Sequence, residues 1–236
     1  MTLSIIIPAY NEAATIATLL RSVAGVDFGD MDSEVIVVDD HSTDTTAAEV
    51  TAANVPVTLI TLPKNSGKSA AIRAGLKVAT GEYVVIQDAD LEYEPKDIKT
   101  LLDHAIQNNL PAVYGSRRLG EKIGIAPGTK NRFYFGGVAL TTLTNALFLS
   151  HITDEPTCYK LVQRDILLSM QLTEERFGFC PEVTAKLLRG KHSITELPIA
   201  YHPRSVAEGK KIKFKDALEA TYILLKYRLL PKRLWK

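Results

Sequence analysis

Residues 82–92 read EYVVIQDADLE, and this stretch decides the fold. Residues 84–86 are a β-branched run that predicts a buried strand, and two carboxylates, Asp88 and Asp90, follow it at once. Carboxylates at the end of a strand can converge on one hard cation such as Mg²⁺ or Mn²⁺. Such a cation keeps most of its ligands as water and phosphate oxygens, so it needs few protein carboxylates. Aspartate is also a common turn residue, so a simple turn into the next helix explains the pair about equally well.

Length and composition indicate one globular domain with a sizeable core. The chain has 236 residues, of which 46% are hydrophobic and 23% charged, as in ordinary soluble proteins. Cys158 and Cys180 are far apart in sequence and form no metal-spaced cluster, which predicts a reducing compartment and no disulfide framework. The chain enters a predicted strand at Leu3, so we expect no secretory signal peptide.

Charge is unevenly distributed along the chain. The net charge is +1, but residues 210–236 contain nine Lys and Arg residues and two acidic ones, so this tail carries +7 and the rest −6. A basic tail on an acidic body predicts an anionic surface or a phosphate-bearing partner. The Leu and Tyr residues interleaved with the charges argue against a merely solvated helix face.

Predicted strands alternate with predicted helices as far as Arg117. Strands are expected at residues 3–7, 34–38, 57–61, 84–86 and 113–117. This alternation predicts an α/β, Rossmann-like fold, with a mostly parallel central sheet and helices on both faces. In the first helix Ile16, Leu19, Leu20 and Val23 share one face, and Asn11 is a plausible N-cap.

Ligands of such sheets collect where the parallel strands end. Four polar segments would meet there, at residues 8–12 (PAYNE), 39–40 (DD), 88–90 (DAD) and 115–117 (GSR). The first strand is not followed by G-x-G-x-x-G, and residues 67–69 (GKS) lack the earlier glycine of a P-loop. These departures argue against a Rossmann dehydrogenase and a P-loop NTPase.

The motifs resemble a known family. In the first half they are residues 7–12 (IPAYNE), 37–44 (VVDDHSTD), 65–68 (NSGK) and 88–90 (DAD), similar to those of inverting family 2 glycosyltransferases with the GT-A fold. In the second half they are residues 115–117 (GSR), 153–160 (TDEPTCYK), 201–204 (YHPR) and 208–211 (EGKK). These resemble the branch that includes dolichyl-phosphate mannose synthase and bacterial polyprenyl-phosphate glycosyltransferases. The motifs keep the family's order over nearly the whole chain.

The resemblance implies a GT-A domain over residues 1–209 and a basic, amphipathic, membrane-associating tail over residues 210–236. Within the domain, residues 1–118 would bind the nucleotide sugar and residues 119–209 the acceptor. A nucleotide-sugar donor carries a diphosphate leaving group, so a divalent cation and fixed cations should stabilise the departing charge. Asp88 and Asp90 match the family's Asp-x-Asp (DXD) motif for Mg²⁺ or Mn²⁺, with Asp90 as the more direct ligand. Glu92 stands where the mannose synthases carry glutamine and is a further candidate ligand.

The resemblance also implies a donor site. Tyr10 would pack on the nucleobase, while Glu12 and Asp39 would accept hydrogen bonds from base or ribose; capping of a helix N-terminus is the rival role for Glu12. The expected donor-binding residues are Pro8, Tyr10, Glu12, Val37, Asp39, Lys68, Asp88, Ala89, Asp90, Arg204 and Lys210.

Arginine suits phosphate because its planar fork matches phosphate oxygens. The resemblance implies that Arg117 and Arg132 hold the acceptor phosphate, and that Arg204 and Lys210 close over the donor diphosphate. One arginine alone is a weak signal, as the adjacent Arg118 illustrates.

The resemblance implies that Asp154 matches the family position where a general base would stand for hydroxyl acceptors. A phosphate acceptor is already anionic, so we expect Asp154 to orient other groups while positioning and charge stabilisation carry the catalysis. The expected catalytic residues are Asp88, Asp90, Arg117 and Asp154.

Two segments predict contact with a membrane. Residues 133–150 contain no ionisable side chain except Tyr134, but they are only marginally long enough to span a bilayer. We expect a helix or helix pair at the membrane interface, although an ordinary core helix fits the same pattern. In the tail, Leu218, Tyr222, Leu225 and Leu229 form one stripe among basic residues, which predicts an amphipathic helix on the anionic cytoplasmic leaflet. Many relatives continue into transmembrane helices, so we expect a peripheral enzyme, a shortened chain or a membrane-anchoring subunit.

The leading interpretation is a metal-dependent inverting glycosyltransferase that moves mannose or glucose from a GDP- or UDP-sugar to a polyprenyl or dolichyl phosphate. Its nearest rival is a family 2 enzyme with a hydroxyl acceptor, such as a saccharide or glycolipid. The sequence also leaves open a nucleotide-sugar or lipid-phosphate binding module without turnover, and a nucleotidyltransferase. Nucleic-acid binding is poorly supported, because the basic residues gather at one end and no base-stacking module is recognisable.

Overall fold

The computed structural model describes residues 1–127, 132–204, 214–231 and 235. The strands are β1 (Thr2–Ala9), β2 (Asp32–Asp39), β3 (Thr58–Thr61), β4 (Tyr83–Ile86), β5 (Ala112–Ser116), β6 (Lys160–Gln163) and β7 (Thr195–Pro198). The helices are α1 (Ile16–Ala24), α2 (Thr46–Ala52), α3 (Lys68–Val78), α4 (Lys96–Gln107), α5 (Arg117–Lys122), α6 (Arg132–Phe148), α7 (Arg164–Ser169), α8 (Phe179–Arg189) and α9 (Phe214–Leu229).

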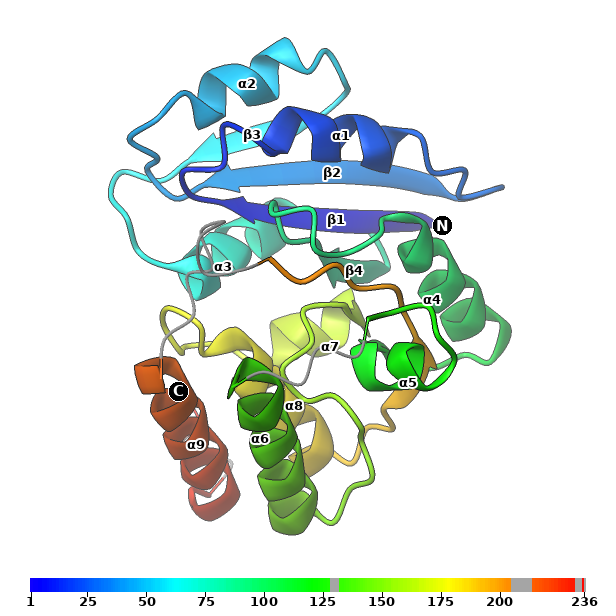
Figure 1. Ribbon diagram of the computed structural model, residues 1–236, viewed down its shortest axis with the longest axis vertical. Helices are drawn as coiled ribbons and strands as arrows, with labels where there is room; N and C mark the ends of the chain where they lie inside the picture. Colours follow the sequence, from blue (N-terminus) through cyan, green and yellow to red (C-terminus); the bar gives the residue numbers. More distant parts are fainter. Residues whose placement is uncertain (128–131, 205–213, 232–234, 236) are drawn as a thin grey trace.

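The strands form one seven-stranded sheet in the order β3-β2-β1-β4-β6-β5-β7 (Figure 1). Strand β6 runs antiparallel to β4 and β5, and the other neighbouring pairs are parallel. The predicted mostly parallel α/β sheet is therefore confirmed. Because β6 lies between β4 and β5, the two halves of the chain share this sheet. Strands β1, β2, β4 and β5 run in the same direction, so they all end at one edge of the sheet, which we call the carboxyl edge.

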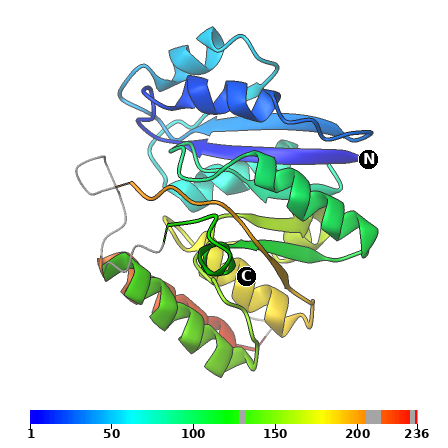
Figure 2. The same ribbon diagram turned by 45° about the vertical axis from the view of Figure 1, so that its right-hand side comes forward.

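Helices cover both faces of the sheet, as predicted (Figure 2). Side chains alternate along a strand, so Ile5 and Ile7 of β1 pack with α1, α2 and α4, whereas Ile6 packs with α3, α7 and α8. All three isoleucines are fully buried. A strand covered on both sides reads as a continuous apolar run, which explains the unbroken β-branched stretches in the sequence.

Helix α1 buries its predicted stripe but begins later than the sequence suggested. The N-cap residue is Thr15, whereas Asn11 adopts φ 51° and its Oδ1 accepts a 2.8 Å hydrogen bond from the Thr43 amide. Asn11 therefore joins the loop after β1 to the loop after β2, and the N-cap prediction is wrong because that tertiary contact takes its side chain.

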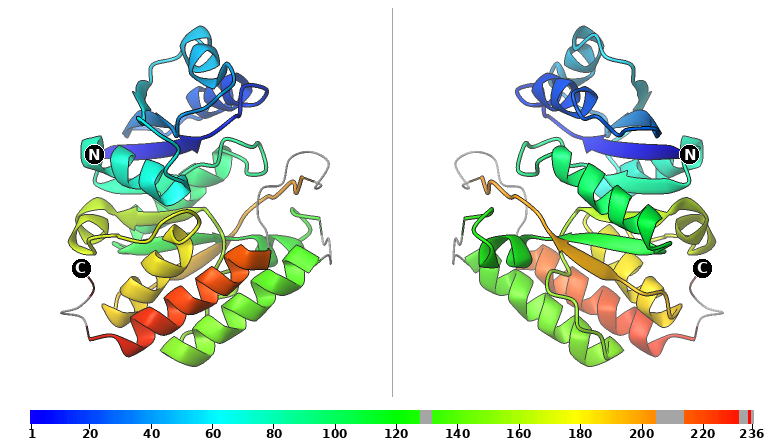
Figure 3. Two further views of the ribbon diagram at one scale, coloured as in Figure 1. Left: turned by 90° about the vertical axis from the view of Figure 1, so that its left-hand side faces the viewer. Right: turned by 90° about the vertical axis from the view of Figure 1, so that its right-hand side faces the viewer.

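Helices α6 and α9 lie side by side at the end of the molecule farthest from β3 (Figure 3). They pack on α8 through a third apolar cluster that contains Ala185, Ile223, Leu224 and Tyr227. Within the described parts of the chain, no helix is long and apolar enough to cross a bilayer.

A buried polar contact fixes α9 against α8. Lys186 Nζ lies 2.6 Å from Glu182 Oε1, and the Tyr227 hydroxyl donates to that oxygen at 2.9 Å. Lys186 and Glu182 are almost fully buried, so each needs the other to offset the loss of hydration. This contact sets which face of α9 turns inward.

The turn before α3 needs a glycine. Gly67 has φ +86°, and a Cβ built on it would lie 2.8 Å from the Cα of Arg176. The amides of Ser66 and Gly67 both donate to the Asp40 carboxylate at 2.7 Å. The turn is thus fixed by a carboxylate on one side and by backbone on the other, and it presents Lys68 as the first residue of α3.

We expect Gly67→Ala to lower the free energy of unfolding by about 3 kcal/mol, since it adds steric overlap to the cost of a left-handed residue. Gly29→Ala is the matched control, because Gly29 also has a positive φ (+68°) but a Cβ there meets nothing within 4 Å. Its loss should be about 1 kcal/mol by urea denaturation. Equal losses for the two variants would contradict the close approach to Arg176.

Candidate active site

The loops after β1, β2 and β4 meet at the carboxyl edge. Besides the Asn11 contact, the Glu12 amide donates to Thr46 Oγ1 at 2.9 Å, and the Asp40 amide donates to the Ala9 carbonyl at 2.8 Å. The Gln87 amide donates to the Ile6 carbonyl at 3.0 Å and leads β4 directly into Asp88. The sheet topology therefore brings the predicted polar segments together.

Asp88 is neutralised from within the protein. It forms an ion pair with Lys68, and Lys68 Nζ also lies 3.0 Å from Cys158 Sγ. Burial, the largest single influence, would raise the pKa of Asp88, but Lys68, Cys158 and Arg117 together lower it. Burial opposes the charge of Lys68 as well, yet Asp88 raises the pKa of Lys68 well above its usual value. Both groups are therefore charged in the folded protein.

Asp90 lies close to two other carboxylates, those of Glu12 and Glu92, and Arg204 contacts all three. Arg204 donates from Nη2 to Asp90 Oδ2 at 2.9 Å, and its Nη1 lies 3.7 Å from Glu12 Oε2. Its Nε lies 3.5 Å from Glu92 Oε1, so one guanidinium serves three carboxylates. Burial, followed by the charges of Asp88 and Glu92, raises the pKa of Asp90 to about 7. One internal cation therefore leaves an excess of negative charge at this point.

Glu92 ties the segment 201–204 to the loop of residues 87–92 that follows β4. Its Oε2 accepts the Tyr201 hydroxyl at 2.5 Å, and its Oε1 accepts the Arg204 amide at 2.9 Å. Its carbonyl accepts the His202 amide at 2.8 Å, next to a bridge between Tyr93 and Tyr201. The proposed third metal ligand is thus placed beside Asp90, with its carboxylate engaged by this segment.

Arg117 and Asp154 form a buried pair where β5 ends. Arg117 donates from Nε to Asp154 Oδ2 at 2.7 Å and from Nη2 to Oδ1 at 2.8 Å, and its amide reaches Oδ2 at 2.9 Å. The guanidinium also lies over the Tyr201 ring, 5.0 Å from the centroid. Burial opposes the charge of Asp154, but Arg117 outweighs it and lowers the pKa of Asp154. A carboxylate with both oxygens occupied and a lowered pKa is a poor general base near neutral pH.

The other predicted donor residues divide into two groups. Asp39 lies at the carboxyl edge, where its Oδ1 accepts the Ser42 amide at 3.1 Å, and Pro8, Tyr10 and Ala89 adjoin that edge. Val37 lies inside β2, with its side chain fully buried in the core, and the structure does not bring that side chain to the site. Arg132 begins α6, but its side chain, like the whole of Lys210, lies outside the described residues.

Several residues at the site were not singled out by sequence reasoning. They are Cys158 beside Lys68, Tyr93 and Tyr201 beside Arg117, and Glu196 beneath Asp154. Cys158 and Tyr201 stand inside the motifs TDEPTCYK and YHPR, which was the only available signal. Their partners lie far along the chain, so periodicity and spacing cannot pair them.

The residues present suit a hard divalent cation. In the described part of the chain, no three His, Cys, Asp or Glu side chains are arranged to hold a metal ion. A cation that retains water and phosphate ligands needs fewer, and Asp90 supplies a carboxylate that shares Arg204 with Glu12 and Glu92. Carboxylate oxygens at Asp88 and Asp90 fit Mg²⁺ or Mn²⁺ better than a soft metal.

Solved structures share this architecture. Glucosyl-3-phosphoglycerate synthase of Mycobacterium tuberculosis, in complex with UDP, superposes with a TM-score of 0.75 at 19% identity, over 98% of this chain and 81% of that chain. A second structure of this synthase holds Mn²⁺, UDP and phosphoglyceric acid, with a TM-score of 0.73 at 21% identity, over 98% of this chain and 79% of that one. At these identities the likeness establishes the fold alone.

Curated relatives share more of the sequence. The dolichol-phosphate mannosyltransferase of Pyrococcus furiosus is 30% identical over 98% of this chain, and an undecaprenyl-phosphate 4-deoxy-4-formamido-L-arabinose transferase of Sodalis glossinidius is 40% identical over 88%. The chain spans 64% and 62% of the lengths of these two relatives. A dolichyl-phosphate beta-glucosyltransferase of Trichomonas vaginalis is 30% identical over 96% of this chain and 74% of its own length.

The sequence pattern of the family "Glycosyl transferase family 2" matches residues 4–169. This stretch runs from β1 through α7 and includes Asp39, Asp88, Asp90, Arg117 and Asp154. The chain therefore belongs to glycosyl transferase family 2 and has the GT-A fold.

Proposed function

We propose that the chain is a metal-dependent inverting glycosyltransferase that moves a hexose from a GDP- or UDP-sugar to a polyprenyl phosphate. The observation that carries this proposal is an oriented, largely buried arginine near Asp88: Arg117, whose side chain is 14% exposed, is fixed by Asp154, and together with Lys68 it lowers the pKa of Asp88 against burial. The relatives named above support a lipid-phosphate acceptor, because their names share it while their sugars differ. Structures of the same fold with UDP and Mn²⁺ support the donor class and the cation.

At the donor end, Asp39 and Glu12 accept hydrogen bonds from the nucleoside, and Lys68 and Arg204 supply positive charge near the diphosphate. Bound at Asp88 and Asp90, Mg²⁺ or Mn²⁺ would supply Lewis-acid stabilisation of the departing diphosphate. Arg204 pairs with Asp90 in this structure, so it stands close enough to exchange that carboxylate for phosphate oxygens.

At the acceptor end, Asp154 occupies the Nε and Nη2 edge of Arg117 and leaves the Nη1 edge for a phosphate oxygen. The acceptor phosphate is already anionic, so it attacks the sugar in line without a general base. Rate enhancement then comes from holding two anions in place, which makes the reaction effectively unimolecular.

The apolar surface of α6 and α9 fits an anionic membrane. Leu218, Tyr222, Leu225 and Leu229 are 57%, 65%, 38% and 78% exposed on α9, although the opposite face of that helix is already buried. On α6, Phe135 is 60% exposed. Lys215 and Arg228 are exposed on α9 beside this stripe. A peripheral position on the cytoplasmic leaflet would give the site access to a lipid-borne phosphate.

The activity is tested with radiolabelled GDP-mannose and UDP-glucose, polyprenyl phosphate and Mn²⁺. We expect label to pass into the organic extract, with a loss of at least about 100-fold in Arg117→Ala, as for removal of one fixed charge from a transition-state site. Arg118→Ala is the matched control, because Arg118 stacks on Tyr134 at 3.8 Å and should retain transfer. Transfer of label only to a saccharide or glycolipid in a parallel reaction, or release of pyrophosphate, would support the rival enzymes instead.

Asp154→Asn tests the absence of a general base. We expect transfer to persist at a reduced rate with unchanged donor binding, while the free energy of unfolding falls by about 3 kcal/mol, because a buried arginine loses its counter-ion. The lowered pKa of Asp154 means that this difference is fully present above the usual value of 3.8 and shrinks as pH falls below it. Complete loss of transfer with normal donor binding would contradict the proposal.

Asp90→Asn should weaken Mn²⁺ binding at least about tenfold in the presence of nucleoside diphosphate, since an ionised ligand is replaced by a neutral one. Electron paramagnetic resonance of free Mn²⁺ measures this directly. Asp165→Asn is the control, because the Asp165 side chain is 94% exposed and lies 3.6 Å from its sequence neighbour Arg164. Equal Mn²⁺ affinity in both variants would remove Asp90 from the metal site.

Tyr222→Asp should reduce co-sedimentation with vesicles that contain anionic lipid, because it places a charge in the exposed stripe of α9. Val78→Asp on α3 is the control, since Val78 is also exposed (44%) but lies on a helix that packs against the sheet. If both variants bind vesicles like the unmodified protein, α9 is not the membrane-binding surface.

A further inference from the structure

Asp154 stands on a loop between α6 and β6 whose backbone is fixed by one carboxylate. Glu196 Oε2 accepts the Thr153 amide at 2.6 Å, and Glu196 Oε1 accepts the Asp154 amide at 3.0 Å. The hydroxyl of Thr153 is in turn 2.6 Å from that of Ser116, the residue before Arg117. Glu196 thus holds the backbone next to the Arg117–Asp154 pair, and the proposed reaction gives Glu196 no role of its own.

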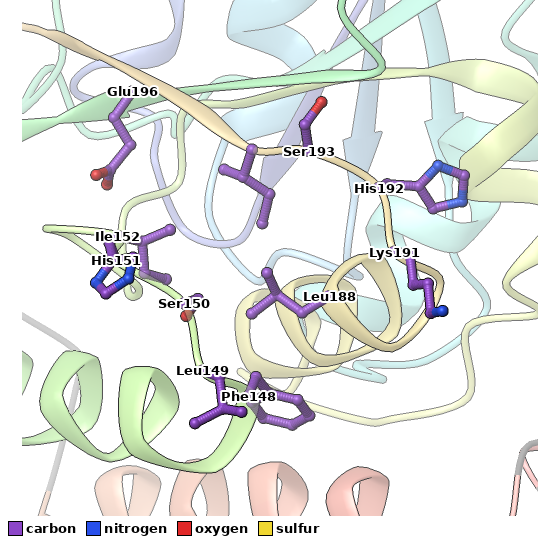
Figure 4. A pocket seen from close by; sticks show the side chains of 11 residues that line it. Phe148, Leu149, Ser150, His151, Ile152, Leu188, Lys191, His192, Ser193 and Glu196 are labelled. Carbon is purple, nitrogen blue, oxygen red and sulfur yellow. The ribbon is translucent and has the colours of Figure 1, made fainter.

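Strand pairing explains why Glu196 reaches this loop. Strand β7 runs parallel to β5, with Glu196 opposite Tyr114 and Pro198 opposite Ser116. Arg117 follows β5 directly, so the backbone of β5 positions Arg117. Strand β7 positions Asp154 through the Glu196 side chain. The two strands are hydrogen-bonded to each other, so the two members of the pair are positioned together. Figure 4 shows the Glu196 side chain extending from β7 toward His151 and Ile152, along the wall of a hollow of about 550 Å³.

This position is unfavourable for a carboxylate. Burial raises the pKa of Glu196 although the Thr153 and Asp154 amides lower it, so the ionised form is less stable here than in water. A glutamate at the other end of the sheet makes similar contacts, and there the hydrogen bonds outweigh burial. Glu34 accepts the Thr80 amide at 2.6 Å and the Gly81 amide at 3.2 Å, and its pKa is lowered. A glutamate can therefore hold a loop by its backbone amides without an environment that raises the pKa of the carboxyl group, as the environment of Glu196 does.

We propose that Glu196 is a positioning residue for acceptor binding: by holding the Thr153 and Asp154 amides it sets the place of the Asp154 carboxylate, and through it the direction of the Arg117 guanidinium. This inference rests on the proposed function, in which Arg117 holds the acceptor phosphate. In this role Glu196 acts through Asp154, by way of its hydrogen bonds to the Thr153 and Asp154 amides.

Glu196→Gln keeps the shape of the side chain but replaces one accepting oxygen by an amide group that cannot accept. One of the two backbone amides then loses its partner. We expect the KM for polyprenyl phosphate to rise about tenfold or more, as for a lost charge-assisted hydrogen bond, while the KM for the nucleotide sugar stays within about twofold. Glu34→Gln, the matched control, should lower the melting temperature and leave both KM values unchanged.

A double variant separates positioning from general weakening of the fold. If Glu196 acts through Asp154, the double variant has nearly the same acceptor KM as Asp154→Asn alone. The effects of the two substitutions are then strongly non-additive. Multiplicative effects on the acceptor KM would overturn the inference, as would equal rises in the KM values of both substrates.

A spectroscopic readout keeps the inference testable apart from the activity. The ¹⁵Nε–¹H resonance of Arg117, assigned by its loss in Arg117→Lys, reports the hydrogen bond to Asp154. It should shift in Glu196→Gln and not in Glu34→Gln. A shift in a protein that transfers no sugar would refute the proposed function and leave the positioning role standing. An unchanged resonance in Glu196→Gln would overturn the positioning role whatever the activity.

Discussion

The carboxyl edge of the sheet concentrates negative charge that must be neutralised inside the fold. Asp88, Asp90 and Glu92 lie within the six residues that follow β4, and Glu12 approaches from the loop after β1. Two internal cations offset this charge: Lys68 pairs with Asp88, and Arg204 lies among the other three carboxylates. Asp90, Glu92 and Glu12 share the Arg204 guanidinium, so the compensation is incomplete; burial, followed by the charges of Asp88 and Glu92, raises the pKa of Asp90 to about 7. A site left short of positive charge is one that a divalent cation and its phosphate ligands can complete.

Tyr201 connects the donor and acceptor ends of the proposed site. Its hydroxyl donates to Glu92 in the loop after β4, and its ring lies beneath the Arg117 guanidinium. The same segment delivers Arg204 to Asp90, across 114 residues of sequence. If Arg204 exchanged Asp90 for another partner, the segment 201–204 would move, and with it the Tyr201 ring that supports Arg117. The two ends of the site are therefore physically coupled.

Local sequence patterns predicted the strands and helices, whereas tertiary contacts determined the strand order and the partners of the site residues. The β-branched run before Asp88, the buried face of α1 and the meeting of strand ends followed from periodicity and strand order. The antiparallel place of β6 and the partners of Lys68, Arg204 and Asp154 did not, because each joins segments distant in sequence. Helix α9 shows a different limit: its stripe at Leu218 and Tyr222 was recognised, but Ile223, Leu224 and Tyr227 form a second apolar face, and only packing on α8 shows which face is buried.

The central claim is that Asp90 takes a divalent cation in place of Arg204 when a nucleoside diphosphate binds. Anomalous diffraction from crystals grown with Mn²⁺ and GDP or UDP tests it most directly. The account predicts a manganese peak within about 2.2 Å of an Asp90 carboxylate oxygen, with the Arg204 guanidinium moved onto phosphate. A peak elsewhere, with the Arg204–Asp90 pair intact and nucleotide bound, would contradict it.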